Sequence, residues 1–341
     1  MRRLAHRPML AAAAAVACLC LAPACRFRHP LPGWIQDAPA DSVAAFSGQA
    51  GWMLTHASSQ DLLARAPEAG QALDLFLQKA RINPATETGR LTFHFLGVPQ
   101  PGRAGAAQGL GQVLIQLDQF QHPKALLAAL ANAFPQEGQL RMDGREWPLY
   151  VILDVDTPKL QAHLRAASDG RGRIWIGDLS ALQRLASRGT LASRPDVAAA
   201  AAWISPRAPF QGYLQPEALL TGLAAKALPD QGALRDLPRG LDALLWSVTP
   251  GSGPGQPNRF ELALAGSPEG VARITPWIQR LVAAVAAVQP TPGAPAPEVM
   301  QEKRRVGLRA TLTDAQLKLV MEKLGQPAFS FSLSPGSAPA A

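Results

Sequence analysis

The sequence predicts an α+β fold made of two similar β-α-β-β-α-β-α halves, with mainly antiparallel sheets and helices packed on one face. Short apolar strands follow Gly/Pro-rich loops twice, at residues 113–117 and 260–264. The kinds of element then recur in the same order after each of them. Helix starts are indicated by proline, which suits the first helical position because its missing N–H costs no hydrogen bond there. The prolines concerned are Pro123, Pro158, Pro195, Pro216 and Pro268.

The first half is predicted from hydrophobic periodicity and from helix-start patterns. Residues 43–54 are extended, and the stretch at 58–61 has the form of a capping box that starts a helix over 60–80. The later elements are strands at 90–96 and 113–117 around a loop at 97–109, a helix at 124–134, a strand at 147–153, a helix at 158–167, a strand at 173–177 and a helix at 180–187.

The second half repeats this order after a linking helix at 196–204. Its elements are a strand at 210–214, a helical region at 216–237, strands at 241–248 and 259–265, a helix at 268–288, a Pro-rich loop at 289–297, a strand at 306–312 and a helix at 314–324. Ser267 is a capping serine for one of these helices, and Thr313 with Gln316 forms a capping box for another. The shared order resembles the ferredoxin-like split β-α-β plan.

Residues 1–24 have the three-part layout of a secretory signal peptide. A positively charged start with Arg2, Arg3 and Arg7 precedes an unbroken run of 13 apolar residues at 10–22, and Ala22-Pro23-Ala24 supplies small residues for cleavage. The apolar run is short for a membrane span, because a ~30 Å hydrocarbon core needs about 20 residues. An anchor that is never cleaved is the alternative interpretation.

The three cysteines are Cys18, Cys20 and Cys25, so the body that follows cannot form an internal disulfide. A single cysteine at the mature N-terminus is explained by lipidation. Here the sequence resembles bacterial lipoprotein precursors, whose lipobox ends in a cysteine that becomes the acylated first residue. The match is the segment 22–25, and it departs from the family pattern at Ala22 and Pro23. The resemblance implies that Cys25 carries palmitate and holds the protein at a membrane.

Two alternatives to this lipidation site stay open. Residues 15–18 form a second candidate lipobox that ends at Cys18, and an ordinary signal peptidase could cleave after Ala24. Arg26 follows Cys25 where an aspartate would favour retention in the inner membrane. The expected location is therefore the cell envelope, on the periplasmic face of the outer membrane if the cell has one.

These features divide the chain into five parts. We expect a signal peptide at 1–24, a lipidated N-terminus and Pro-rich tether at 25–40, a first α+β half at 41–190, a second at 191–334 and a disordered tail at 335–341. Removing the three leader arginines from the formal charge of +8 leaves +5. Lys303-Arg304-Arg305 is the one compact basic run, and we expect it outside the core. Such scattered charge indicates a solvated surface and no nucleic-acid partner.

No residue is assigned a catalytic, cofactor-binding or metal-binding role, and no cofactor is expected. The histidines beyond the tether, which include His94, His122 and His163, have neither an i,i+4 pair nor another metal-ligand spacing. Asp154 and Asp156 share a strand face, and a capped helix start explains them better than a cation site. The glycine-rich pieces at 109–111, 170–172 and 251–255 each precede a strand, whereas a phosphate cradle needs a following helix.

Most of the seven tryptophans lie in apolar stretches and are predicted to be core residues. Trp34 and Trp52 lie close to the tether, where contact with a membrane or a partner is the alternative to burial. With no catalytic motif, the predicted function is that of a non-catalytic binding or assembly protein of the cell envelope, with an envelope protein as a possible partner. The alternatives are an envelope hydrolase without a recognisable motif, which needs a polar cluster in a pocket, and a carrier of an apolar ligand, which needs a deep dry cavity.

Overall fold

The computed structural model describes residues 31–55, 67–83, 89–99, 107–142, 144–157, 160–187, 189–216, 240–251, 256–287 and 295–323. Residues 31–341 group into one compact unit and residues 1–30 into another, and the description below concerns the first of these. The predicted leader, Cys25, Trp52's side chain and the predicted tail lie outside the described residues.

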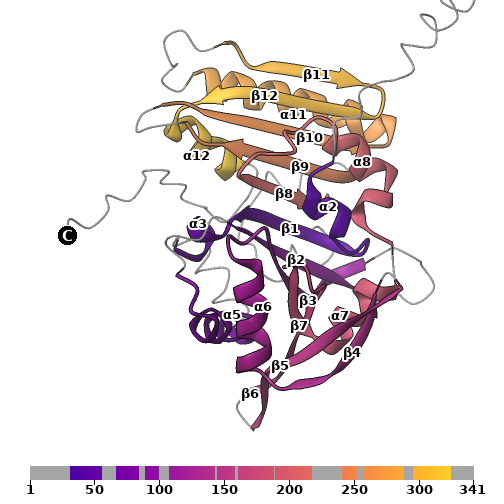
Figure 1. Ribbon diagram of the computed structural model, residues 1–341. Coiled ribbons are helices and arrows are strands. Elements are labelled where there is room, and N and C mark those ends of the chain that lie inside the picture. Colours follow the sequence, from indigo (N-terminus) through magenta and orange to yellow (C-terminus); the bar gives the residue numbers. More distant parts are fainter. Residues whose placement is uncertain are drawn as a thin grey trace, which may run out of the picture. The chain divides into compact units, whose positions relative to one another are not determined.

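The described strands of this unit form one continuous twelve-stranded sheet (Figure 1). The strand order is β11-β12-β10-β9-β8-β1-β2-β3-β7-β6-β5-β4. Every neighbouring pair is antiparallel. The strands are β1 (Ser42–Gln49), β2 (Arg90–Pro99), β3 (Ala107–Asp118), β4 (Gln136–Met142), β5 (Arg145–Thr157), β6 (Leu160–Ser168), β7 (Ile174–Asp178), β8 (Phe210–Leu214), β9 (Leu241–Thr249), β10 (Asn258–Gly266), β11 (Glu298–Glu302) and β12 (Arg305–Leu312).

The middle of this sheet is the pairing of β1 with β8, which we call the seam. It joins Ala44 to Leu214 and Ser47 to Gln211, and so unites strands that are about 165 residues apart in the chain. From the seam, β2, β3, β7, β6, β5 and β4 follow on one side, and β9, β10, β12 and β11 on the other. The two parts of the chain therefore share one sheet.

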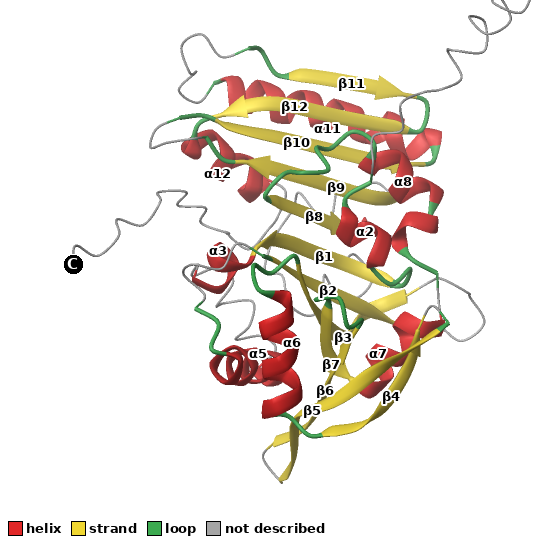
Figure 2. Cartoon of the chain, in the orientation of Figure 1, coloured by secondary structure: helices red, strands yellow, loops and turns green. Residues whose placement is uncertain are grey.

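Helices lie on both sides of the sheet (Figure 2). They are α2 (Gly33–Asp37), α3 (Ala50–Thr55), α5 (Pro67–Ala80), α6 (Pro123–Ala133), α7 (Leu179–Ser187), α8 (Pro195–Ala201), α11 (Pro268–Ala286) and α12 (Asp314–Lys323), with a 3-10 turn, η2, at Leu191–Ser193. Side chains of α5, α6, α11 and α12 pack on the face that carries Phe93, Ile115 and Phe260, and we call it the apolar face. Side chains of α2, α7 and α8 cover the opposite face, which we call the polar face.

Several predicted helix starts are confirmed. α6, α8 and α11 each begin with proline at the first position, at Pro123, Pro195 and Pro268. The Ser267 hydroxyl accepts a hydrogen bond from the Gly270 N–H at 3.0 Å, which satisfies a donor that the first helical turn leaves unpaired.

The predicted fold class is wrong. A split β-α-β plan places parallel strands on either side of a third strand, but here β1, β2 and β3 are successive antiparallel neighbours. Two separate sheets with helices on one face were expected, whereas the seam makes one sheet with helices on both faces. The prediction missed the seam because no local sequence pattern reports a pairing between residues 42–49 and 210–214.

The predicted helix at 158–167 is also wrong, since these residues contribute most of strand β6. Leu160, Leu164 and Ala167 have helical spacing, which is why the segment resembled a helix. In the structure Leu164 and Ala166 face the apolar side, while Arg165 and Ala167 face the other side. The same residues also alternate with a period of two, and pairing with both β5 and β7 selects the strand.

Other differences lie at the ends of the predicted elements. The expected extended stretch at 43–54 stops at Gln49 and continues as α3. The described part of the expected tether is ordered and contains α2. Strands β4 and β11 were not predicted, and Gly109 and Gly111 lie inside β3 and not in a loop. The Gly170–Gly172 piece is a turn between β6 and β7, where both glycines have a positive φ.

Candidate functional site

A row of polar side chains crosses the polar face at a single register of the sheet. Each member is the direct cross-strand neighbour of the next, from β12 through β10, β9, β8, β1 and β2 to β3. We call it the polar row, and its members are Arg309, Glu261, Ser247, Gln211, Ser47, Thr92 and Gln116. All except Arg309 are at most 3% exposed, so their polar atoms need partners inside the protein.

At the seam those partners come from the row itself and from two neighbouring segments. The Ser47 and Thr92 hydroxyls lie 2.8 Å apart, and Arg90 donates to Ser47 Oγ at 2.8 Å. Gln211 Oε1 accepts from Trp34 Nε1 at 2.6 Å, and Gln211 Nε2 donates to the Ser205 carbonyl at 2.6 Å. The seam is thus tied to α2 on one side and to the segment before β8 on the other.

Glu261 is the buried charged member of the row and is 2% exposed. Its carboxylate accepts from Ser247 Oγ at 2.8 Å, from Arg259 Nη2 at 2.7 Å and from the backbone N–H of Ser205. Arg309 Nε lies 3.4 Å from the same carboxylate. Three donor residues and a nearby guanidinium compensate the buried carboxylate, because the cost of burying a charge is met only by several well-placed partners.

His94 lies beside the polar row on β2 and is fully buried. Its Nε2 lies 3.1 Å from Gln116 Oε1, and its ring centroid lies 5.1 Å from that of Trp175 and 6.4 Å from that of Trp34. Burial lowers the pKa of His94 to about 4, and the hydrogen bond with Gln116 offsets only part of this effect. His94 is therefore neutral at neutral pH, because burial disfavours its charged form.

The first described residues, 31–41, cover part of the polar face, and we call them the clasp. Trp34 and Ile35 are 2% and 0% exposed and pack in the core cluster of this face. Asp37 Oδ1 accepts from Arg173 Nη1 at 2.8 Å, and Asp41 Oδ2 accepts from Arg184 Nε at 2.8 Å. These bonds tie the clasp to α7 and to the residue directly before β7, so the chain is fixed within a few residues of Leu31.

The structure places the other predicted polar residues away from the polar row. Asp154 Oδ1 lies 2.6 Å from His163 Nδ1, and Asp154 Oδ2 accepts from Arg165 Nη2 at 3.2 Å. The hydrogen bond from His163 lowers the pKa of Asp154. Asp154 thus serves an exposed ion-pair network on β5 and β6. His122 directly precedes α6, and its side chain makes no capping hydrogen bond there.

The expected helix start at Asp154 and Asp156 does not exist, because β5 continues to Thr157 and β6 follows. Within the described ranges, no group of three or more His, Cys, Asp or Glu side chains is arranged to hold a metal ion. Tryptophan burial was predicted more accurately. Three of the expected core residues are at most 6% exposed, namely Trp147, Trp175 and Trp246, and Trp203 and Trp277 are partly buried. Trp34 is a core residue.

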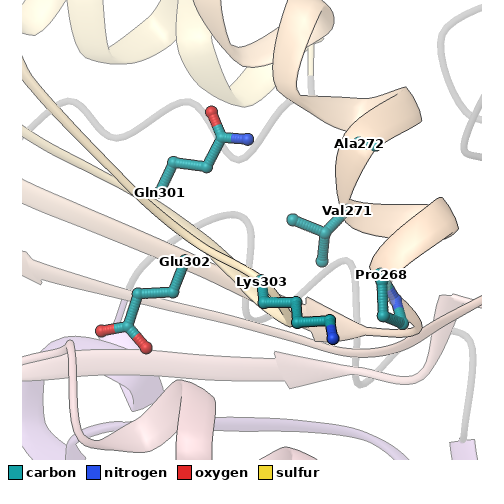
Figure 3. Close-up of a pocket in the computed structure, with 6 residues that line it drawn as sticks. All are labelled: Pro268, Val271, Ala272, Gln301, Glu302 and Lys303. Carbon is teal, nitrogen blue, oxygen red and sulfur yellow. The ribbon is translucent and has the colours of Figure 1, made fainter.

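An open groove of about 540 Å³ lies between the start of α11 and the turn that follows β11. Figure 3 shows Pro268, Val271 and Ala272 of α11 on one side, facing Gln301 and Lys303 on the other. Glu302 completes the lining, and its carboxylate pairs with Arg305. As expected, Lys303 and Arg304 are exposed, and Arg305 is half-buried. The groove is therefore apolar on the helix side and polar or charged on the strand side.

Chemically, the polar row and the groove differ in access. His94 and Tyr213 are fully buried, and burial lowers the pKa of His94 and raises the pKa of Tyr213. Both side chains are therefore shielded from solvent. The groove, by contrast, is open to solvent and polar on one side.

The sequence carried a weak pattern for the polar row. Ser47, Gln211 and Ser247 each lie between apolar residues or glycine in a mostly apolar strand. A single such residue also fits a strand with one solvated face, so the pattern alone does not reveal burial. Comparison with protein-family models, with curated proteins and with solved structures finds no match to this chain. Among the described helices, none combines the length and the apolar character that a membrane span requires.

Proposed function

We propose that the protein is an exported lipoprotein, held at a membrane of the cell envelope through acylated Cys25, and that its body is a non-catalytic binding or assembly protein. The observation that carries the proposal is Cys25 itself, which directly follows a leader with small residues at its end and is the last cysteine of the chain. Acyl chains on this residue give stable anchoring, because each buried CH₂ contributes ~0.8 kcal/mol.

The role of the body is inferred from how its polar groups are used. The polar row and His94 bond to the clasp and to neighbouring strands, which is a structural use of these groups. The groove at Val271 and Lys303 is open to solvent and offers an apolar wall beside charged side chains. Such a mixed surface suits the side chains of a partner protein, whose contacts combine an apolar centre with a polar rim.

The anchoring experiment is metabolic labelling with palmitate, followed by membrane fractionation. We expect Cys25→Ala to abolish labelling and to release the body from membranes. Cys18→Ala is the matched control, because Cys18 ends the second candidate lipobox, and it should leave labelling unchanged. Continued labelling of Cys25→Ala, or unchanged fractionation, would exclude Cys25 as the anchor, and loss of labelling in Cys18→Ala alone would assign the anchor to Cys18.

The binding role has its own test at the groove. A photo-crosslinking amino acid at Gln301, which lines the groove, should form a discrete adduct in intact cells. The same amino acid at Gln279, an exposed position on α11 outside the groove lining, is the control and should form none. Absence of an adduct at Gln301, or equal adducts at both positions, would contradict a partner protein at this groove.

A further inference from the structure

The clasp limits how far the fold can lie from its anchor. If Cys25 is the acylated residue, five residues lie between it and Leu31, and the six steps of an extended chain cover at most ~3.6 Å each, or about 20 Å. From Leu31 onward the chain adds no further reach, because hydrogen bonds hold it against the fold. Gln36 Nε2 donates to the Leu31 carbonyl at 3.0 Å, and Trp34, Asp37 and Asp41 are fixed to the polar face.

This reach is short compared with the size of the fold. Strands lie ~4.8 Å apart, so β4, six strands from β1, and β11, on the other side, are each about 25 to 30 Å from the seam. Across the sheet, a helix layer packs ~10 Å from the strands on each side, which puts the outer sides of α2 and α11 roughly 30 Å apart. A 20 Å tether therefore selects the clasp side of the molecule.

Positively charged side chains near the clasp favour contact with a negatively charged membrane surface. Arg173 pairs with Asp37 of the clasp and is 31% exposed, and Arg171, two residues earlier, is exposed. On the other flank Arg207 is exposed in the segment whose Ser205 carbonyl bonds to Gln211 under Trp34. Within the described part of the chain, neither Arg171 nor Arg207 forms an ion pair. Basic side chains close to a membrane are attracted by anionic headgroups.

We propose that the surface around the clasp, with Arg171 and Arg207 on its flanks, rests on the anionic phospholipid surface that holds the Cys25 anchor. This inference rests on the proposed lipid anchor and adds to it an orientation and a lipid class. Diacyl or triacyl chains hold the protein at the membrane, and the arginines determine which side faces it. The groove at α11 and the helices of the apolar face then point toward the compartment where partners are found.

The chain offers a matched pair of reporter positions. Gln36 on α2 and Gln279 on α11 are both exposed glutamines, and they lie on opposite sides of the sheet. The processed protein has one cysteine, blocked by its lipid, so Gln36→Cys or Gln279→Cys introduces one free thiol for a fluorophore. The full lipidated chain is purified in detergent and placed in vesicles of phosphatidylcholine and phosphatidylglycerol that contain a lipid with a nitroxide on its headgroup.

We expect the fluorophore at position 36 to lose fluorescence to the nitroxide and the fluorophore at position 279 to keep it. In a second comparison, Arg171→Glu with Arg207→Glu, or vesicles of phosphatidylcholine alone, should restore fluorescence at position 36 while the protein stays bound through its lipid. Equal quenching at both positions, or quenching at 36 that neither change affects, would overturn the proposal. Mass spectrometry of the purified chain checks acylation independently, so a missing lipid counts against the proposed function and not against this orientation.

Discussion

The two faces of the sheet are both buried, but they are built differently. The apolar face is filled by large side chains such as Phe93, Phe260 and Leu308, under helices that begin with recognisable proline and serine caps. The polar face carries a row of hydrogen-bonding side chains under a short helix, α2, that no local pattern predicted. Apolar contacts are non-directional, whereas buried hydrogen bonds require one particular alignment. The comparison teaches that the first face supplies cohesion and the second fixes how the strands meet at the seam.

The largest expected effect comes from the apolar face. Phe93 is 1% exposed, and Phe93→Ala should lower the free energy of unfolding by roughly 3–5 kcal/mol, because the substitution removes buried apolar area and leaves a cavity. Urea denaturation measures this change in the free energy of unfolding. Leu179→Ala, at a side chain that is 42% exposed, is the control and should change stability by no more than about 0.5 kcal/mol. Similar losses in both variants would show that burial on this face is not what holds the fold.

The second effect depends on pH and belongs to the polar face. The unfolded chain protonates His94 below its ordinary pKa of 6.5, whereas the folded chain does so only near pH 4. The free energy of unfolding should therefore fall as the pH drops through this window, by roughly 3 kcal/mol in total, since one pKa unit is worth ~1.4 kcal/mol.

His94→Gln removes the titrating ring and should flatten this part of the stability-pH profile. His163→Gln, at an exposed histidine, is the matched control and should keep the slope. Denaturation series at pH 7.0 and pH 4.5 make the comparison. A profile that His94→Gln leaves unchanged would mean that His94 is not the group responsible.

The third effect tests the directional bonding at the seam. Gln211→Leu leaves the buried Trp34 Nε1–H and the Ser205 carbonyl without their partner, and the expected loss is about 1–3 kcal/mol. Trp34→Phe removes the other half of one bond. The double variant should lose less than the sum of the two single variants, because the bond they share can be lost only once. Simple additivity would argue against a coupling between α2 and the seam.

The smallest effect concerns one hydroxyl of the polar row. Thr92→Val keeps the shape of the side chain and removes its 2.8 Å contact with Ser47. Since Ser47 also accepts from Arg90, it is not left without a partner, and we expect a loss of about 0.5–1.5 kcal/mol by urea denaturation. A loss comparable to that of Phe93→Ala would mean that single hydrogen bonds of the row contribute far more than the comparison of the faces implies.

The apolar face was largely predictable, because its residues are arranged with periods that a short segment reveals. The strand at 210–214 and the helices that start at Pro123 and Pro268 lie where local patterns indicated them. The stretch at 158–167 was mispredicted because its leucines satisfy the helical and the strand period alike, and only pairing with β5 and β7 decides between them.

The polar row and the clasp were not predictable for a different reason. Trp34 bonds to Gln211 across 177 residues, and Asp41 bonds to Arg184 across 143. Ser47 and Gln211 in apolar strands are equally compatible with a solvated sheet face, so their burial depends on what covers them. The reason for a glycine at position 307 also depends on a contact between distant parts of the chain. An added Cβ there would lie 2.0 Å from the Trp203 ring, and this close approach exists only after folding.

The long sequence separations at the clasp also set an order of events in folding. Residues 31–41 leave the ribosome well before their partners Arg173, Arg184 and Gln211, which are 136 to 177 residues further along the chain. Loops of that length close slowly, and pairing between distant strands is a late step in large β-rich chains. The N-terminal segment therefore stays unattached until most of the chain has been made, and closing of the clasp is a late step of folding.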